Sequence, residues 1–198
     1  MCTAWSDILA EVLARGETPL TMGVAGHRFL SEAAADWIRE EFDRLFRVAA
    51  SLRCRRAPAA VSALAAGTDQ FFASSALAHG LALHVVVPHA RYEHEFCRGP
   101  EREQYRALLR RADLCAVIPH ASASDEAFTW AMQEVVRRSS SLIAGLRPDS
   151  PEEGPFTEAA IRHARRLARP CLALDLSRSE IRWLTRPDDA HDGASPKE

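Results

Sequence analysis

The chain has 198 residues, a length that suits one domain with a short extension. Hydrophobic residues make up 47% of the sequence and charged residues 26%, as in soluble globular proteins, so a wholly disordered chain and a fibrous architecture are excluded. The formal net charge is −2 at pH 7, which argues against a generally basic nucleic-acid-binding protein but leaves room for a local basic patch.

The cysteines and the first residues predict a cytoplasmic protein. The five cysteines form no CxxC pair, and the first fifteen residues carry Asp7 and Glu11, which suit a surface helix and not a secretory signal. We therefore expect a reducing compartment. Cys115 and Cys171 lie inside apolar runs, where we expect both thiols to act as small hydrophobic side chains. No apolar run has the length of a membrane helix.

Six apolar runs alternate with helical patterns along the chain. The runs cover residues 20–25, 59–64, 81–87, 114–118, 141–146 and 171–176. Helical spacing of apolar residues predicts helices over about 31–50, 69–79, 100–111, 124–138 and 157–168. Ser31 is the expected N-cap of the first of these helices, and Gly80 is expected to end the second.

Most of the apolar runs lack clean alternation, so both faces of each strand are expected to be buried. This pattern predicts an α/β domain with a doubly wound parallel sheet of about six strands, right-handed crossovers and helices on both faces. We expect an N-terminal helix over 1–17, the domain over 18–178 and a polar, disordered tail over 179–198.

Ligands of open α/β sheets bind beyond the carboxyl ends of the strands. The residues that follow the first five runs are glycines, hydroxyls, carboxylates and cations, which would gather at one edge. They are Gly26, His27 and Arg28; Gly67, Thr68 and Asp69; Pro88, His89 and Arg91; Pro119 and His120; and Arg147, Gly154, Thr157 and Glu158.

The first two groups suggest a phosphate site. Gly26 permits a close backbone approach to a ligand, and Arg28 can offer forked donors to a phosphate, unless the glycine only forms a turn and the arginine is solvated. Gly67 and Thr68 open a helix whose N–H groups attract anions. Asp69 would compete with a phosphate there, so we expect it to cap the helix or to contact a ribose.

The stretch before the last helix adds further candidates. Gly154 and Thr157 are expected to contact a phosphate, and Thr157 could instead cap the helix. Glu158 can accept hydrogen bonds from a ribose or stabilise positive charge at an anomeric carbon, or it can be an ordinary first-turn glutamate. His27 is an acid–base candidate because imidazoles titrate near neutrality, and Arg147 would add positive charge.

These segments, read in order, resemble a known superfamily. AGHRF, SALAAGTDQ, a strand ending in VVP, ADLCAVI and GPFTEAAIRHARRLARP are similar to the SLOG superfamily, which takes in the LOG cytokinin-activating proteins and the DprA/Smf domains. The resemblance covers about 20–176. It implies a Rossmann-like nucleotide-binding fold, whose members hydrolyse nucleoside monophosphates or sense nucleotide-derived signals in bacterial defence.

The loop that corresponds to the LOG signature PGGxGTxxE departs from that pattern. Glu152 and Glu153 replace the paired glycines, and Glu158 follows Thr157 directly. Two carboxylates near a phosphate weaken its binding unless they point away. The segments Gly26-His27-Arg28 and Gly67-Thr68-Asp69 resemble the nucleotide-sensing members of the superfamily more closely than the LOG enzymes.

Other motifs carry weaker signals. His89, His94 and Cys97 include zinc-ligand types, but no fourth ligand follows at a familiar spacing, so we expect no metal and no cofactor. The loop that holds these residues crosses the edge of the sheet, so Arg91, Tyr92 or His94 could instead contact a base or form a lid over the site. Arginines at 102, 106, 110 and 111 form a basic stripe that we expect to be a solvated helix face. No G-x-S-x-G and no G-x-G-x-x-G motif occurs.

The leading hypothesis is a domain that binds a nucleotide or a nucleotide-derived second messenger and signals through self-association or a partner protein. The alternative is a hydrolase of the N-glycosidic bond that uses Glu158 as its catalytic residue. A third reading is a scaffold without a working site. We expect neither a membrane nor a nucleic acid as partner. The assignment of a binding site depends on distant turns meeting around one pocket.

Overall fold

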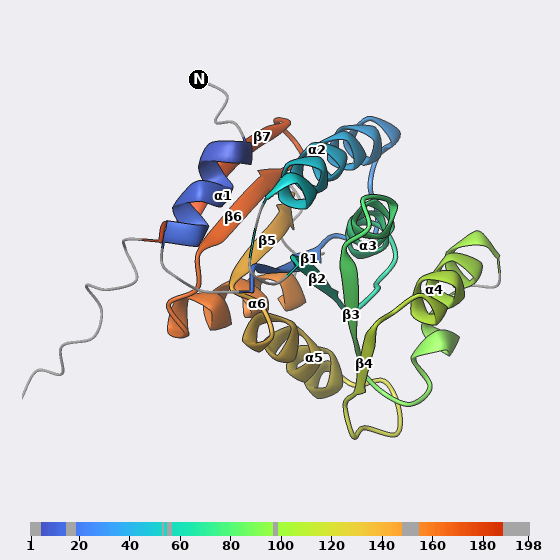
Figure 1. The fold of residues 1–198 in the computed structure, drawn as a ribbon. Coiled ribbons are helices and arrows are strands. Elements are labelled where there is room, and N and C mark those ends of the chain that lie inside the picture. The colour runs from blue at the N-terminus through green and yellow to red at the C-terminus, as the bar shows by residue number, and fades with distance from the viewer. Residues whose placement is uncertain are drawn as a thin grey trace, which may run out of the picture.

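The computed structural model describes residues 5–14, 19–52, 54, 57–96, 99–147 and 155–187 (Figure 1). The strands are β1 (Thr21–Gly26), β2 (Ala59–Ser62), β3 (Ala82–Val87), β4 (Leu114–Val117), β5 (Ser141–Leu146), β6 (Cys171–Asp175) and β7 (Glu180–Thr185). The helices are α1 (Trp5–Ala14), α2 (Glu32–Ser51), α3 (Thr68–Ala78), α4 (Pro100–Arg110), α5 (Asp125–Arg137) and α6 (Pro155–Arg166). A 3-10 helix, η1 (Tyr92–Glu95), precedes α4.

The strands form one sheet in the order β4-β3-β2-β1-β5-β6-β7, with every neighbouring pair parallel except β6 and β7. The chain passes outward from β1 through β2, β3 and β4, and then returns to the other side of β1 with β5. The order therefore reverses between β1 and β5, where ligands bind in sheets of this kind. The predicted fold class, a mostly parallel doubly wound sheet with helices on both faces, is confirmed.

The prediction of a disordered tail over 179–198 is wrong for its first residues, because residues 180–185 form strand β7. β7 pairs with β6 in the antiparallel direction, with Leu174 opposite Ile181 and Leu172 opposite Trp183. Residues 176–179, mostly polar, form the turn that joins the two strands. A half-exposed edge strand contains many polar residues, which is why the composition of this stretch suggested a tail. Residues 188–198 lie outside the described ranges, as do 1–4 and 15–17 of the expected N-terminal helix.

The core is divided into two layers by the sheet. Side chains of α1, α2, α3 and α4 fill the layer on one face, where Phe72 contacts Phe42 and Phe46 with ring centroids 5.2 and 4.8 Å apart. Side chains of α5 and α6 fill the other layer. Adjacent strand residues alternate between the layers, so Val24 joins the first layer and Ala25 the second. Figure 1 shows α2 and α3 on one face and α5 and α6 on the other.

Local signals set the helix ends, including the predicted ones at Ser31 and Gly80. The Ser31 hydroxyl accepts a hydrogen bond from the N–H of Ala34 at the start of α2, and the Ser124 hydroxyl caps α5 in the same way. Gly80 follows α3 with a φ of +75°, a conformation that favours glycine.

Strand β4 contradicts the prediction that its apolar run is buried. Leu114 and Val117 are 52% and 54% exposed, and Cys115 is exposed as well, because β4 is the last strand of the sheet on its side. Cys171 on β6 is fully buried, as predicted.

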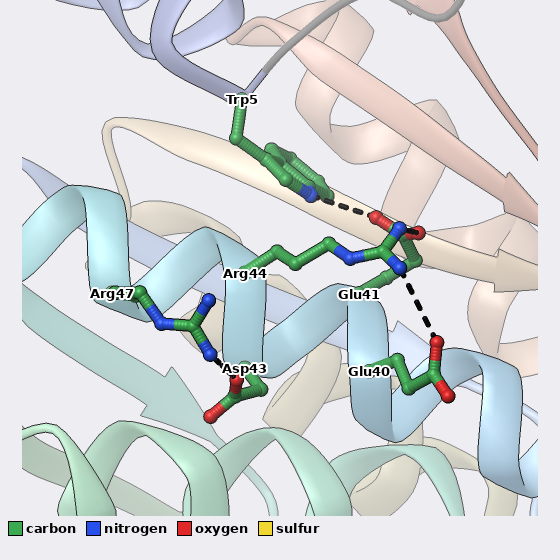
Figure 2. Close-up of polar contacts among 6 residues, drawn as sticks. All are labelled: Trp5, Glu40, Glu41, Asp43, Arg44 and Arg47. Carbon is green, nitrogen blue, oxygen red and sulfur yellow. Dashed lines mark hydrogen bonds and ion pairs between the residues drawn. The ribbon is translucent and has the colours of Figure 1, made fainter.

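A buried polar contact joins α1 to α2 (Figure 2). The Trp5 indole N–H donates to one carboxylate oxygen of Glu41 at 2.9 Å, and Arg44 donates to the other at 2.7 Å. Glu41 is 5% exposed, whereas Glu40, which also pairs with Arg44, lies at the surface. Across the described residues, no helix has the length and apolar character needed to cross a membrane.

Candidate functional site

A pocket opens at the carboxyl edge of the sheet, near the reversal of strand order. Its lining comes from the ends of β1, β2 and β3, from η1, from the first turns of α3 and α6 and from α5. The lining residues are Gly26, Arg28, Ala63, Ala65, Asp69, Pro88, Tyr92, Phe128, Met132, Phe156 and Thr157. The cavity has a volume of about 110 Å³. Four predicted site residues, Gly26, Arg28, Asp69 and Thr157, therefore meet at one cavity.

Aromatic rings form one wall of this pocket. Phe128 of α5 lies 5.3 Å from Phe156 of α6 and 6.2 Å from Tyr92 of η1, measured between ring centroids. Tyr92 is buried and also contacts Phe96 and Tyr105. A wall of this kind suits the flat face of a heteroaromatic ring.

Arg28 brings positive charge to the pocket. Its side chain is exposed, and its Nη2 donates to the backbone carbonyl of Glu95 at 3.4 Å, a long and weak hydrogen bond. An anionic ligand can therefore recruit this guanidinium without breaking a strong contact. Thr157, in the first turn of α6, adds a buried hydroxyl-bearing side chain to the lining.

Asp69 brings a buried carboxyl group to the same cavity. Burial raises its pKa to about 7, although hydrogen bonds from Ser62 and from the amides of Ala63 and Ala65, together with the charge of Arg28, act in the opposite direction. The Ser62 hydroxyl lies 3.3 Å from Oδ2. Asp69 thus holds the turn after β2. Its partners lie before α3, so its predicted role as a cap of this helix receives no support, and its predicted contact with a ribose stays a prediction.

The turn that Asp69 holds is strained. Leu64 is buried and has a φ of +58°, a left-handed conformation that is costly for a bulky residue. It lies between Ala63 and Ala65, which both line the pocket. Backbone strain of this kind concentrates at binding sites, where the surrounding contacts maintain it.

Gly67 and Thr68 pack inside the protein and are not part of the lining. The Thr68 hydroxyl and backbone N–H both donate to the carbonyl of His27, at 3.0 and 3.2 Å, and the N–H of Gln70 donates to Ala65. These donors at the start of α3 are therefore committed to protein carbonyls. The predicted phosphate cradle at this helix receives no support from their geometry.

Close packing explains the glycines around Thr68. A Cβ at Gly26 would lie 2.5 Å from Thr68 Cγ2, and a Cβ at Gly67 would lie 2.4 Å from the carbonyl oxygen of Arg28. Gly67 also has a φ of +78°. The two glycines let α3 begin directly against the end of β1, which places Asp69 beside Arg28.

His27 and Arg147 connect the ends of β1 and β5. The backbone N–H of Arg147 donates to His27 Nε2 at 3.1 Å, and Arg147 Nη1 donates to the carbonyl of Phe29 at 3.4 Å. His27 is buried, so this geometry gives it a role in positioning the loop and offers no support for acid–base chemistry. Glu158 is exposed on α6, outside the lining. Gly154, Glu152 and Glu153 lie outside the described residues.

Sequence reasoning missed the apolar side of the pocket. Ala63 and Ala65 carry no chemical signal, and Phe128, Met132 and Phe156 lie on helices, whereas the prediction considered polar residues that follow strands. The spacing of Phe128 and Met132, four residues apart on one helix face, was the available signal.

The metal and basic-stripe candidates can also be placed. In the described parts of the chain, no group of three or more His, Cys, Asp or Glu residues could hold a metal ion, and Cys97 lies outside them. The stripe on α4 makes internal contacts: Arg102 donates to the carbonyl of Phe96, Arg106 pairs with Glu93 and Arg111 donates to Leu77.

The chain was compared with known families and proteins. No protein-family model matches it, and no curated protein matches it. Among solved structures it is similar to DNA processing protein A (DprA) from Streptococcus pneumoniae, with a TM-score of 0.59, 14% identity and coverage of 90% of this chain and 62% of that one.

Two further structures are similar. DprA from Helicobacter pylori, described for its single-stranded DNA binding mode, has a TM-score of 0.57 and 15% identity over 82% of this chain and 66% of that one. The molybdenum cofactor binding protein from Rippkaea orientalis has a TM-score of 0.52 and 12% identity over 87% and 93%. The chain thus spans less than two thirds of either DprA protein. These likenesses, at 12–15% identity, show that the chain shares its fold with these proteins.

Proposed function

We propose that this domain binds a nucleotide or a nucleotide-derived messenger in the pocket at the carboxyl edge of the sheet. One observation carries the proposal: the aromatic wall of Tyr92, Phe128 and Phe156 shares a single cavity with the Arg28 guanidinium. The wall offers contact to a flat base, and the guanidinium offers forked donors to a phosphate. The solved structures with this fold include proteins that bind single-stranded DNA or the molybdenum cofactor, which supports ligand binding in general.

The alternative, hydrolysis of an N-glycosidic bond, receives less support from the geometry. Glu158 would have to reach the anomeric carbon of a bound ligand, yet its side chain is exposed and outside the lining. We expect no release of free base from nucleoside monophosphates. Release by the wild-type protein that disappears in Glu158→Gln would favour the hydrolase instead.

Titration calorimetry with the full chain tests the proposal. The ligands are nucleoside phosphates, cyclic dinucleotides, ADP-ribose derivatives, the molybdenum cofactor and a short single-stranded DNA. We expect a phosphate-bearing compound to bind, and Arg28→Ala to weaken it about tenfold or more through loss of a charge-assisted contact. The control is Arg47→Ala, which removes an exposed arginine paired with Asp43 on α2. If a folded sample binds none of the compounds, or if Arg28→Ala binds like the wild type, the proposal is wrong.

The carboxyl group of Asp69 gives a second readout of the same site. The positive charge of Arg28 lowers the pKa of Asp69, so an anion that neutralises Arg28 raises it further from about 7. Binding near pH 7 should therefore take up protons, and affinity should fall as the pH rises through 7. Calorimetry in buffers of different ionisation enthalpy measures this uptake. The uptake should vanish in Asp69→Asn, and uptake that persists there comes from another group.

A further inference from the structure

A second surface of the molecule carries concentrated positive charge at the opposite edge of the sheet. Its members, called here the arginine surface, are exposed side chains near the ends of two neighbouring helices: Arg137 and Arg138 of α5 and Arg162, Arg165 and Arg166 of α6. Each helix returns from the carboxyl end of one parallel strand to the amino end of the next, so both helices end at the amino edge. Figure 1 shows α5 and α6 packed side by side on one face of the sheet.

The arginines of α6 share one face of the helix. Positions 162, 165 and 166 have the spacing i, i+3 and i+4, which places side chains together. Ala160, Ile161 and Ala164 form the buried face, so the arginines point to solvent. Thr157, which lines the pocket, lies nine residues before Arg166, or about 14 Å along the helix axis. The arginine surface is therefore separate from the pocket.

The two helices contribute to one positive field. His163 lies between them: Arg166 Nη2 is 2.9 Å from its Nδ1, and the charges of both Arg166 and Arg137 help to lower the pKa of the imidazole, after the larger effect of burial. Positive charges from α5 and α6 thus act on the same side chain.

Among the described residues, few acidic side chains pair with the arginine surface. Glu134 is shared by Arg137 and Arg138, at 3.1 and 2.7 Å. Within the described part of the chain, no carboxylate pairs with Arg162, Arg165 or Arg166. On α2, by contrast, Arg39 has Asp36 and Arg47 has Asp43. The helix dipole favours a cation or two in the last turn, but it does not account for a surface continued over two helices.

We propose that the arginine surface binds the phosphodiester backbone of a nucleic acid. Guanidinium groups match phosphates with two parallel donors, and a run of phosphates suits several arginines spread over two helices better than a single anion does. Contacts of these arginines with phosphates are expected to depend little on base sequence.

Fluorescence anisotropy with the full chain and a labelled oligonucleotide, single-stranded or duplex, tests the proposal. We expect binding that weakens steeply as salt rises, and a loss of about tenfold or more in Arg162→Glu/Arg166→Glu. The matched control is Arg39→Glu/Arg47→Glu, which makes the same change of charge on α2. Circular dichroism checks that both variants are folded. Single strands and duplexes that bind alike support contact with phosphates, and a preference for one identifies the form of the nucleic acid.

Several results would overturn this proposal. One is the absence of binding to either oligonucleotide at low salt, and another is an equal loss in the α2 control. Equally tight binding of an acidic peptide of the same charge assigns the surface to acidic proteins. A loss in Arg28→Ala that the arginine variant does not share places the nucleic acid at the pocket.

Discussion

Strands of similar apolar sequence are packed differently at the centre and at the edge of the sheet. The strands β1, β2 and β5 are apolar runs whose carboxyl ends are packed so tightly against α3 that a Cβ at Gly26 or Gly67 does not fit. Strand β4 is also an apolar run, yet Leu114, Cys115 and Val117 are exposed. The composition of these strands does not show which of them are central and which lies at the edge. The strand order does, and the pocket lies at the ends of the central strands.

The largest expected effect is a loss of stability on substituting Gly67, which is packed at the centre of the sheet. Gly67→Ala adds a Cβ at 2.4 Å from the Arg28 carbonyl and requires a residue other than glycine at a φ of +78°. We expect a loss of about 5 kcal/mol in the free energy of unfolding, or failure to fold. The control is Gly80→Ala, which has a φ of +75° but no atom within 4 Å, and should cost about 1–2 kcal/mol. Urea denaturation measures both, and equal losses would refute the close packing.

The next largest effect is a change of stability with pH caused by the buried carboxyl group of Asp69. Its pKa rises from 3.8 to about 7 on folding, so the folded protein keeps a proton that the unfolded chain releases. Its contribution to stability is therefore full below about pH 4, is lost as the pH rises towards 7, and is constant above that. The loss is roughly 4 kcal/mol at 1.36 kcal/mol per pKa unit.

The variant Asp69→Asn isolates this contribution, because an amide does not titrate. Urea denaturation of both proteins from pH 4 to 8 gives the difference between their stabilities. We expect the stability of the wild type to fall relative to that of the variant as the pH rises. A constant difference would mean that Asp69 is ionised throughout this range.

The sequence predicted the elements well because their signals are local. Ser31 and Ser124 cap helices, Gly80 ends one, and apolar runs mark strands, all through contacts within a few residues. The gathering of Gly26, Arg28, Asp69 and Thr157 was predicted from the general behaviour of parallel sheets. Gly26 and Arg28 come from the end of β1 and Thr157 from the helix after β5, the two strands between which the order reverses.

The remaining features depend on contacts between distant residues. Nothing near Thr68 indicates that its hydroxyl is taken by the carbonyl of His27, and nothing near Glu158 indicates that it faces solvent. Nor does the sequence of β4 indicate an edge position, which follows from the strand order. A prediction from residue types thus located the edge of the sheet that holds the pocket and four of its lining residues, but not the apolar side chains that line the rest of it.

A smaller effect extends the comparison to α2, where a buried and an exposed carboxylate lie side by side. Glu41→Ala removes the acceptor of the buried Trp5 indole N–H and should cost about 2 kcal/mol. Glu40→Ala removes only the exposed contact with Arg44 and should cost less than about 0.5 kcal/mol. Thermal unfolding of the two variants distinguishes them. If the two losses match, the contact between α1 and α2 in Figure 2 contributes little.

The smallest effect contrasts two cysteines, one at the edge strand and one inside the sheet. Cys115 on β4 is exposed, whereas Cys171 on β6 is buried, and burial raises the pKa of the Cys171 thiol to about 12. Burial also raises the pKa of Cys115, so labelling of this thiol should be slow at neutral pH and faster in mild alkali.

A maleimide followed by peptide mass mapping tests this contrast in the folded protein. Cys115 should react, and Cys171 should react only after unfolding in urea, because a reagent cannot reach a side chain closed between two strands and a helix layer. Cys115→Ser should change stability by less than about 0.5 kcal/mol, since a surface hydroxyl keeps its water. Protection of Cys115 equal to that of Cys171 would mean that β4 is covered in solution, and the edge of the sheet would then lie elsewhere.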